Sequence, residues 1–144
     1  MEIKRLVLSD SSAVHGIMEK SFSTTWSVAS IENLISGSNA ACFGAFEDDV
    51  LTGYVFLEWI LDEGSLTDIA VLPEYRGRGI SLLLMDALME EAKKQELSFV
   101  TLEVRVSNTP AISLYKKYSF AEVGRRSGYY SAPKEDALLM TCNL

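Results

Sequence analysis

The chain has 144 residues, of which 48% are hydrophobic and 23% charged, and this length predicts a single domain over residues 1–144. No apolar run approaches the roughly 18 residues that cross a membrane, and the first residues lack a secretory signal, so we expect a cytoplasmic protein with no membrane partner. The net charge of −7 argues against a nucleic-acid partner, which needs a basic face, and is compatible with a cationic substrate.

The first part of the chain predicts a strand followed by two helices. Residues 3–8 have strand character, and Asp10 or Ser11 can cap a helix that runs to about Phe22. A shorter amphipathic helix follows and should end near Gly37, because glycine commonly terminates helices.

The middle of the chain predicts an antiparallel meander. Residues 41–46 and 51–60 are rich in aromatic and β-branched side chains, and the short acidic segment between them suits a hairpin turn. A second turn at 62–64 leads into a strand over 65–72, which Pro73 ends.

Helices and strands alternate after the meander. Apolar residues first recur at helical spacing and then at strand spacing, and Asn108 can cap the second of the two helices. These elements are a helix over 80–94, a strand over 99–106, a helix over 109–118 and strands over 121–126 and 137–143.

The strand–helix–strand unit over 65–106 predicts a right-handed parallel crossover within a mixed sheet. The fold class is therefore α/β or α+β. We expect the ligand near this crossover, at the carboxyl ends of the strands.

Two glycines and two arginines stand at the start of the helix in this crossover. Glycine lets the backbone approach a ligand closely, and the free N–H groups of a helix N-terminus bind phosphate well. Arg76 and Arg78 add positive charge beside Gly77 and Gly79, so the segment predicts a pyrophosphate site. A tight turn that only packs the helix on the sheet is the alternative for the bare Gly-x-Gly pattern.

Two other nucleotide-binding motifs do not fit this segment. A P-loop would end in Gly-Lys-Ser/Thr, which is missing here. The dinucleotide fingerprint needs a third glycine three residues after Gly79, where Leu82 stands.

The loop, however, resembles the Gln/Arg-x-x-Gly-x-Gly/Ala motif with which GNAT acetyltransferases bind the pyrophosphate of coenzyme A. Here it reads Arg76-Gly77-Arg78-Gly79-Ile80-Ser81. The segments Leu102–Asn108 and Ala111–Phe120 resemble those of the ribosomal-protein-alanine N-acetyltransferases within that superfamily. The similarity extends from about Trp26 to Met140 without a large gap.

This resemblance implies a mixed, mostly antiparallel sheet of about seven strands with about four helices, and acetyl-CoA as co-substrate. It also implies an acceptor, the N-terminal alanine amine of small-subunit ribosomal protein number eighteen, acetylated by direct transfer. The implied coenzyme A-binding residues are Ile69, Ala70, Val71, Arg76, Gly77, Arg78, Gly79, Ile80, Ser81, Leu82, Asn108 and Tyr115.

The resemblance implies two catalytic residues. Glu103 is the expected general base, working through water, and Tyr115 the expected acid that protonates the departing thiolate. Backbone N–H groups near Ala70 and Val71 are expected to polarise the acetyl carbonyl. From the residues alone, the favoured interpretation of Glu103 is an exposed or Arg105-paired glutamate, and Tyr115 could be a core aromatic.

Two positions depart from the family pattern. Ser81 replaces a glycine or alanine, but serine is small and keeps its N–H, so phosphate binding should survive. Ser119 replaces a glycine at an expected left-handed helix stop, at a cost of about 1 kcal/mol.

Other residues are assigned by their context. Trp26, Tyr129 and Tyr130 could wall a peptide channel or simply pack, and Arg125–Arg126 is expected to be a solvated turn. The two cysteines stand alone and the chain has one histidine, so we expect no metal site and two buried thiols. We expect a monomer or weak dimer.

Two other functions stay open at this point. Another GNAT activity would acetylate other protein N-termini or small amines. A non-catalytic acyl-CoA-binding module would follow if the predicted base and acid pointed away from the thioester.

Overall fold

The computed structural model describes residues 1–144 and contains one seven-stranded sheet, with the strand order β1-β2-β3-β4-β5-β7-β6. The only parallel neighbours are β4 and β5. The strands are β1 (Glu2–Arg5), β2 (Ala40–Glu47), β3 (Val50–Ile60), β4 (Glu63–Val71), β5 (Phe99–Arg105), β6 (Ala121–Ser131) and β7 (Lys134–Asn143). The helices are α1 (Ser11–Ser21), α2 (Val28–Ile35), α3 (Ile80–Lys94) and α4 (Thr109–Lys117).

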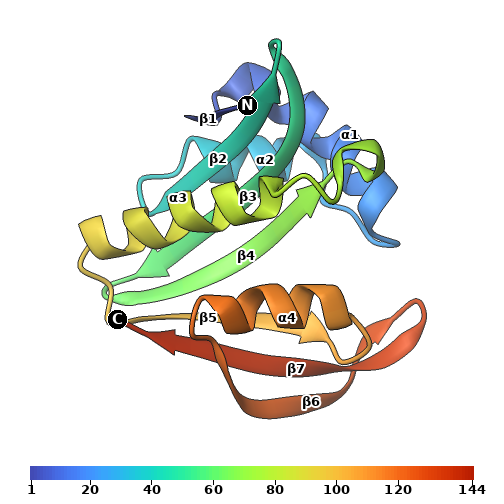
Figure 1. Ribbon diagram of the computed structural model, residues 1–144, viewed down its shortest axis with the longest axis vertical. Coiled ribbons are helices and arrows are strands. Elements are labelled where there is room, and N and C mark those ends of the chain that lie inside the picture. The colour runs from blue at the N-terminus through green and yellow to red at the C-terminus, as the bar shows by residue number, and fades with distance from the viewer.

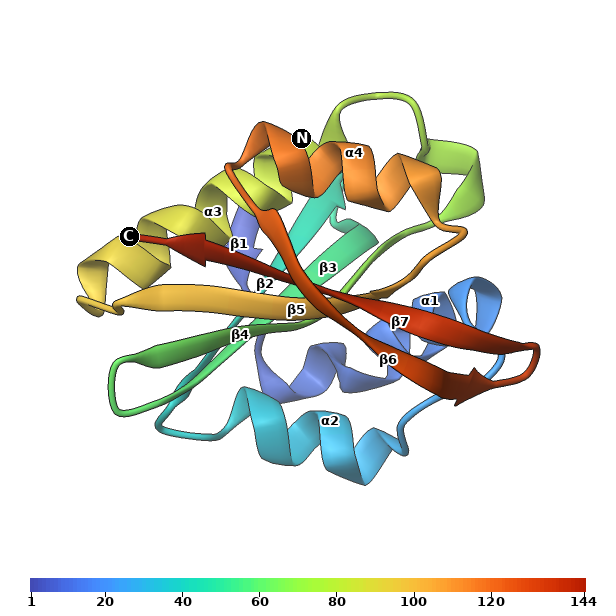
Figure 2. The same ribbon diagram turned by 90° about the horizontal axis from the view of Figure 1, so that it is seen from below.

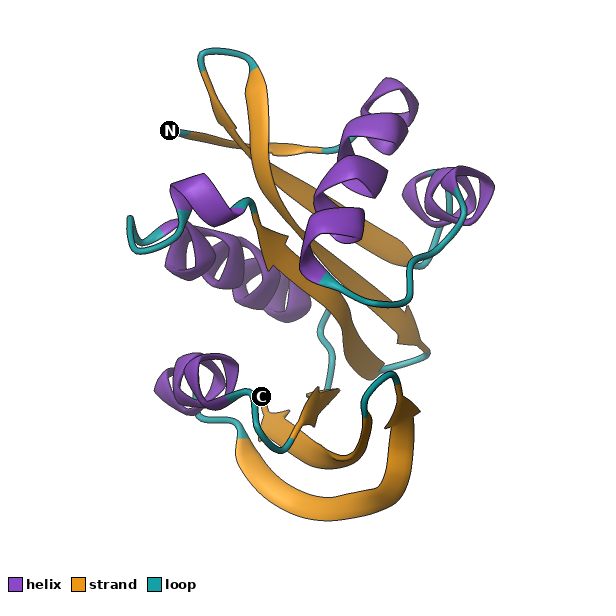
Figure 3. Cartoon of the chain, turned by 90° about the vertical axis from the view of Figure 1, so that its right-hand side faces the viewer, coloured by secondary structure: helices purple, strands orange, loops and turns teal.

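Helices cover both faces of the sheet. Figures 2 and 3 show α1 and α2 on one face and α3 and α4 on the other. Each face has its own core: Val14 and Ile31 belong to the cluster under α1 and α2, while Leu84 and Leu88 belong to the larger cluster under α3 and α4. None of the four helices combines the length and the apolar character needed to cross a membrane.

The predicted helices and the meander are confirmed, and their ends have local causes. The side chain of Ser27 accepts a hydrogen bond from the N–H of Ser30 and caps α2, and Asn108 caps α4 by accepting from the N–H of Ala111. Ser119 adopts the expected left-handed conformation, with φ of 68°.

The first strand is shorter than predicted. It ends at Arg5, and Leu8–Asp10 form a 3-10 turn before α1. The carboxylate of Asp10 accepts a hydrogen bond from the N–H of Val7 rather than capping α1. This local bond turns the chain where strand propensity alone predicted continuation.

The prediction for Arg125–Arg126 is wrong. Both residues lie in β6, where Arg125 pairs with Leu138 and Arg126 with Ala137. Strand β6 extends to Ser131, five residues beyond the predicted end at Arg126, because β7 continues alongside it and satisfies its backbone groups.

A β-bulge interrupts the pairing of β3 with β4. Phe56 pairs with Asp68 and Leu57 with Leu66, so Thr67 is an extra residue on β4. The bulge changes which face each following side chain occupies. Leu66 contributes to the core under α3, whereas Asp68 shares the opposite face with Ala70.

The two parallel strands pair over only a short length. Glu63–Ser65 of β4 pair with Phe99–Thr101 of β5, and beyond these residues β4 pairs only with β3 and β5 only with β7. In Figure 1 the two strands run away from each other toward their carboxyl ends. The parallel crossover predicted from the sequence is therefore present. Because β4 and β5 diverge, each strand has an unpaired edge beyond the residues that pair.

Candidate active site

A cleft of about 1660 Å³ lies where β4 and β5 diverge. It is lined by both strands, by the loop before α3, by α4 and by the β6–β7 hairpin. The cleft brings together Glu103, Tyr115, Asn108, Arg76 and most of the predicted loop, which are far apart in sequence.

The glycine loop has the conformation that its sequence predicts. Gly77 and Gly79 have φ of 78° and 77°, in the left-handed region that favours glycine. Gly79 is also the N-cap residue of α3, and no side chain caps this helix. Its first N–H groups are therefore available to an anion, and Ile80 and Ser81 line the cleft at this point.

The two arginines of the loop lie in different places. Arg76 lines the cleft, and its Nε donates a hydrogen bond of 3.0 Å to the carbonyl of Val71, which ties the loop to the end of β4. The guanidinium of Arg78 lies 4.9 Å from the ring centre of Tyr75 and 3.8 Å from the carboxylate of Glu47. Neither Arg78 nor Leu82 is among the residues that line the cleft.

The open edge of β4 presents one backbone donor toward the cleft. The N–H of Leu72 donates to Thr52 on β3, so alternation directs the N–H of Val71 to the opposite, open edge. The N–H of Ile69 on that edge already donates to the carboxylate of Asp68. Of the predicted pair Ala70 and Val71, only Val71 can therefore direct its N–H at a bound carbonyl group.

Glu103 lies on the cleft side of β5, opposite the core residues Leu102 and Val104. Its side chain is 32% exposed, and a carboxylate oxygen lies 3.8 Å from Nη2 of Arg126. A hydrogen bond to Glu103 raises the pKa of Tyr129, which keeps that phenol protonated. Arg105 instead pairs with Glu135 at 3.2 Å, so the alternative Glu103–Arg105 pair does not form.

Tyr115 projects from α4 into the core and also lines the cleft. It is only 5% exposed, and its ring centre lies 5.9 Å from that of Phe120. Burial raises the pKa of Tyr115 well above its ordinary value of 10, so the phenol keeps its proton at neutral pH. A protonated hydroxyl at this position can donate to a leaving group.

The structure adds an acidic group that the sequence reading did not single out. The hydroxyl of Tyr54 donates a hydrogen bond of 2.8 Å to Asp68, and burial raises the pKa of Asp68 to about 6. Thr67 donates to the carboxylate of Glu58, and both Glu58 and Asp68 line the cleft. The sequence shows Asp68 as a carboxylate within an apolar strand. It does not show the bulge at Thr67, which decides the face of the sheet that Asp68 occupies.

Arg105 on β5 contacts the β6–β7 hairpin beside the cleft. Its Nη1 donates to the carbonyl of Pro133 at 2.8 Å, and its guanidinium lies 4.4 Å from the ring centre of Tyr130. Glu135 also accepts from the N–H of Ser107. Hydrogen bonding to the side chain of Ser107, followed by that to Arg105, lowers the pKa of Glu135. Tyr129 and Tyr130 on this hairpin line the cleft, as does Trp26 from the other side.

The cysteines and the histidine lie outside the cleft. Cys42 and Cys142 are free and buried, as predicted, and burial raises the pKa of Cys42 to about 12. His15 pairs with Glu19 on α1, at 3.3 Å. No group of three or more histidine, cysteine or acidic side chains is arranged to hold a metal ion.

Residues 11–120 match the acetyltransferase (GNAT) family. The chain belongs to the GNAT family. The crystal structure of the ribosomal-protein-S18-alanine N-acetyltransferase from Escherichia coli superposes with a TM-score of 0.91 at 29% identity, over 99% of this chain and 92% of the other. The GNAT fold expected from the sequence is thus confirmed.

Relatives named as N-acetyltransferases match most of the chain. The [ribosomal protein bS18]-alanine N-acetyltransferase of Haemophilus influenzae is 32% identical over 145 residues, covering 99% of this chain and 98% of the relative. An N-alpha-acetyltransferase of Saccharolobus solfataricus is 41% identical over 113 residues, covering 69% and 67%. This GNAT protein is an acetyl-CoA-dependent N-acetyltransferase.

Proposed function

We propose that this GNAT enzyme acetylates the N-terminal alanine amine of ribosomal protein bS18. The similarity to enzymes with that name, over nearly the whole chain, supports the acceptor. One observation carries the chemistry: Glu103 and Tyr115 line the same cleft as the glycine loop. Such an acceptor is made in the cytoplasm, where we expect this enzyme to act.

The cofactor half of the cleft is suited to coenzyme A. The N–H groups at the start of α3 can bind the pyrophosphate, and Arg76 adds a positive charge beside them. Asn108, which caps α4, lines the same cleft and can contact the cofactor as well. The N–H of Val71 can stabilise the negative charge that develops on the acetyl oxygen.

Glu103 accepts the proton that the acceptor ammonium loses, directly or through a water molecule. An α-amino group has a pKa of about 7.7–8.0, so it is partly neutral near pH 7 and needs only a modest base. The amine nitrogen then bonds to the acetyl carbon as the carbon–sulfur bond breaks. Tyr115 donates its proton to the departing thiolate.

Direct transfer is favoured over a covalent acetyl-enzyme. A ping-pong route through cysteine would need a reactive thiolate, but both cysteines are buried and neither lines the cleft. Burial raises the pKa of Cys42 to about 12 and also raises that of Cys142, which keeps both in the unreactive thiol form.

Three carboxylates line the acceptor half of the cleft, one of them beside Arg126, whereas Arg76 lies in the cofactor half. The three are Glu58, Asp68 and Glu103, on β3, β4 and β5. Carboxylates in a partly closed site attract a cationic ammonium group. This division of charge fits a protonated amine acceptor opposite a polyphosphate cofactor.

The second candidate is acetylation of a broader set of protein N-termini. The Saccharolobus solfataricus relative, named only as an N-alpha-acetyltransferase, favours this alternative. A small-molecule amine is the third possibility, because carboxylates bind any ammonium group.

The acceptor can be identified by measuring thiol release from acetyl-CoA. The protein is incubated with a peptide bearing the bS18 N-terminus, with the same peptide blocked by N-terminal acetylation, with peptides that begin with other residues, and with a panel of small amines. We expect release only with free N-termini, and fastest with the bS18 peptide. Reaction with small amines alone would disprove the proposed acceptor.

A further inference from the structure

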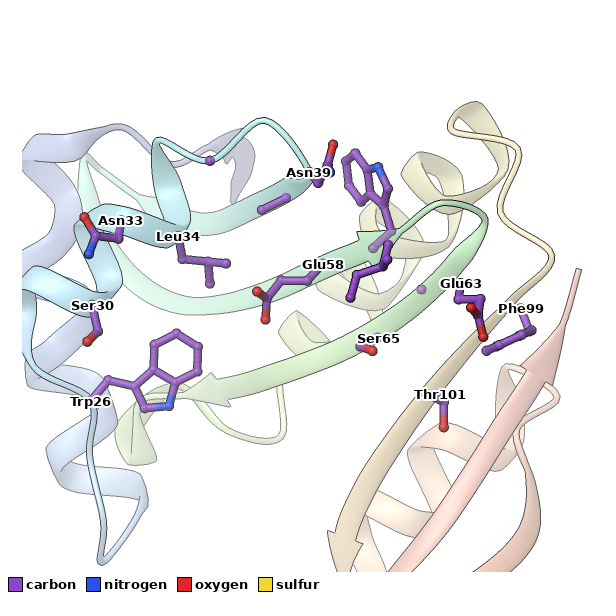
Figure 4. Close-up of a pocket in the computed structure, with 15 residues that line it drawn as sticks. Trp26, Ser30, Asn33, Leu34, Asn39, Glu58, Glu63, Ser65, Phe99 and Thr101 are labelled. Carbon is purple, nitrogen blue, oxygen red and sulfur yellow. The ribbon is translucent and has the colours of Figure 1, made fainter.

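A second groove, of about 880 Å³, lies on the α2 face of the sheet (Figure 4). Trp26 and residues of α2 such as Asn33 form one side, and Glu63 and Phe99 lie at the other. Glu58 lies between them. The groove runs over the ends of β3, β4 and β5 that are farthest from the glycine loop.

The groove is continuous with the catalytic cleft. Four residues line both cavities: Trp26, Glu58, Ser65 and Thr101. Thr101 and Glu103 occupy the same face of β5 two residues apart, which is about 7 Å along a strand. A chain leaving the reaction centre can therefore enter the groove after roughly two extended residues.

The lining of the groove is acidic and aromatic. Glu58 and Glu63 supply carboxylates, Trp26 and Phe99 supply aromatic surfaces, and no lysine or arginine lines it. At its end the β3–β4 turn exposes Ile60 and Leu61, whose exposed fractions of 75% and 84% are the largest among the bulky apolar side chains. Such a surface complements a segment that is positively charged and partly apolar.

We propose that this groove binds the segment of the acceptor protein that follows its acetylated N-terminus. The occupant is an extended, basic polypeptide, with roughly its fourth to eighth residues over Glu58 and Glu63. A protein that binds RNA must be rich in lysine and arginine, so a ribosomal acceptor has the required charge. The inference rests on the proposed function, because it requires a polypeptide acceptor.

Binding in the groove would let the enzyme distinguish acceptors by residues beyond the reacting amine. Three carboxylates around the reaction centre attract any ammonium group. A second contact, several residues away, raises the apparent affinity only for acceptors that carry positive charge at the matching distance.

The test compares kcat/KM for three synthetic acceptors with the same N-terminus. One has three residues, one has twelve with lysine or arginine at positions four to eight, and one has twelve with serine at those positions. We expect the long basic peptide to exceed the other two at least fivefold, with the advantage shrinking as salt is raised.

Glu63→Lys should remove that advantage, because Glu63 lines the groove but not the catalytic cleft. Acetylation of the three-residue peptide should be unchanged. Glu90→Lys is the matched control, since Glu90 is exposed on α3, on the other face of the sheet. It makes the same change in charge and should leave all three acceptors unaffected.

The outcomes separate the two hypotheses. Equal kcat/KM for the long basic and long serine peptides would show that the groove does not bind the acceptor. Equal effects of Glu63→Lys and Glu90→Lys would show the same, and either result would leave the proposed function intact. Acetylation of no peptide would overturn both. A dimer in sedimentation that Glu63→Lys dissociates would instead make a second copy of this chain the occupant, and would also overturn the inference.

Discussion

The hydroxyl of Tyr54 and the carboxylate of Asp68, which lines the cleft, form a 2.8 Å hydrogen bond. Tyr54 is fully buried, so this bond joins the core under α1 directly to the cleft. Burial raises the pKa of the Asp68 carboxyl group, so the stability of the protein depends on pH.

Asp68→Asn should remove a pH-dependent loss of stability. Raising the pKa of Asp68 from 3.8 to about 6 means that its ionisation costs the folded state roughly 3 kcal/mol. Below pH 4 the carboxyl is protonated in both states and the cost vanishes. As pH rises from about 4 to 6, only the unfolded state ionises readily, so stability falls, and it stays lower above pH 6.

Urea unfolding between pH 4 and 8 measures this effect. The free energy of unfolding of Asp68→Asn, relative to that of the wild type, should rise between pH 4 and 6 and then level off. Glu90→Gln, an exposed carboxylate on α3, is the control and should show no such trend. A pH-independent difference for Asp68→Asn would contradict the raised pKa.

Glu103→Gln should lower turnover about 10²-fold or more while barely changing the affinity for coenzyme A. Glutamine keeps the size of the side chain and its position beside Arg126, but it cannot accept a proton. Steady-state kinetics with a bS18 peptide and calorimetry with coenzyme A measure the two quantities. Unchanged turnover would remove Glu103 from the mechanism.

Tyr115→Phe should reduce turnover by about 10²-fold with little loss of stability. The phenyl ring retains the packing against Phe120, so only the proton donor is lost. Because burial raises the pKa of Tyr115, the wild type should show no alkaline loss of activity from this residue below about pH 9. The pH profiles of kcat for both proteins test this, and a wild-type decline between pH 8 and 9 that Tyr115→Phe abolishes would argue against it.

Gly79→Ala should weaken coenzyme A binding and destabilise the protein. An added Cβ meets no atom within 4 Å, so the cost comes from the backbone, whose φ of 77° is unfavourable for alanine by about 1 kcal/mol. Relaxation of this strain would move the N–H groups that begin α3. Calorimetry with coenzyme A and thermal unfolding provide the readouts.

Gly16→Ala is the matched control for that substitution. Gly16 lies within α1, has no atom within 4 Å of an added Cβ and does not line the cleft, so alanine should stabilise the helix by up to about 1 kcal/mol. The two variants should therefore shift the melting temperature in opposite directions. A shift in the same direction would show that backbone conformation does not decide the effect at Gly79.

The sequence alone determined the local structure and the cofactor loop. Glycine at positions 77 and 79, followed by a helical pattern, specified a left-handed loop at a helix start, because few other residues adopt that conformation. Asn108 marked the start of α4, which it caps as predicted. These features depend on neighbours within a few residues, which a sequence displays directly.

Only the tertiary structure decided which carboxylates line the cleft and which partners they have. The bulge at Thr67 turned Asp68 away from the face that it would share with Leu66, and a period-two pattern does not reveal a bulge. The partner of Arg105 proved to be Glu135, and that of Glu103 proved to be Arg126 from a strand extended by its pairing with β7. These contacts depend on strand register and on the divergence of β4 from β5, which are set by packing between residues far apart in the chain.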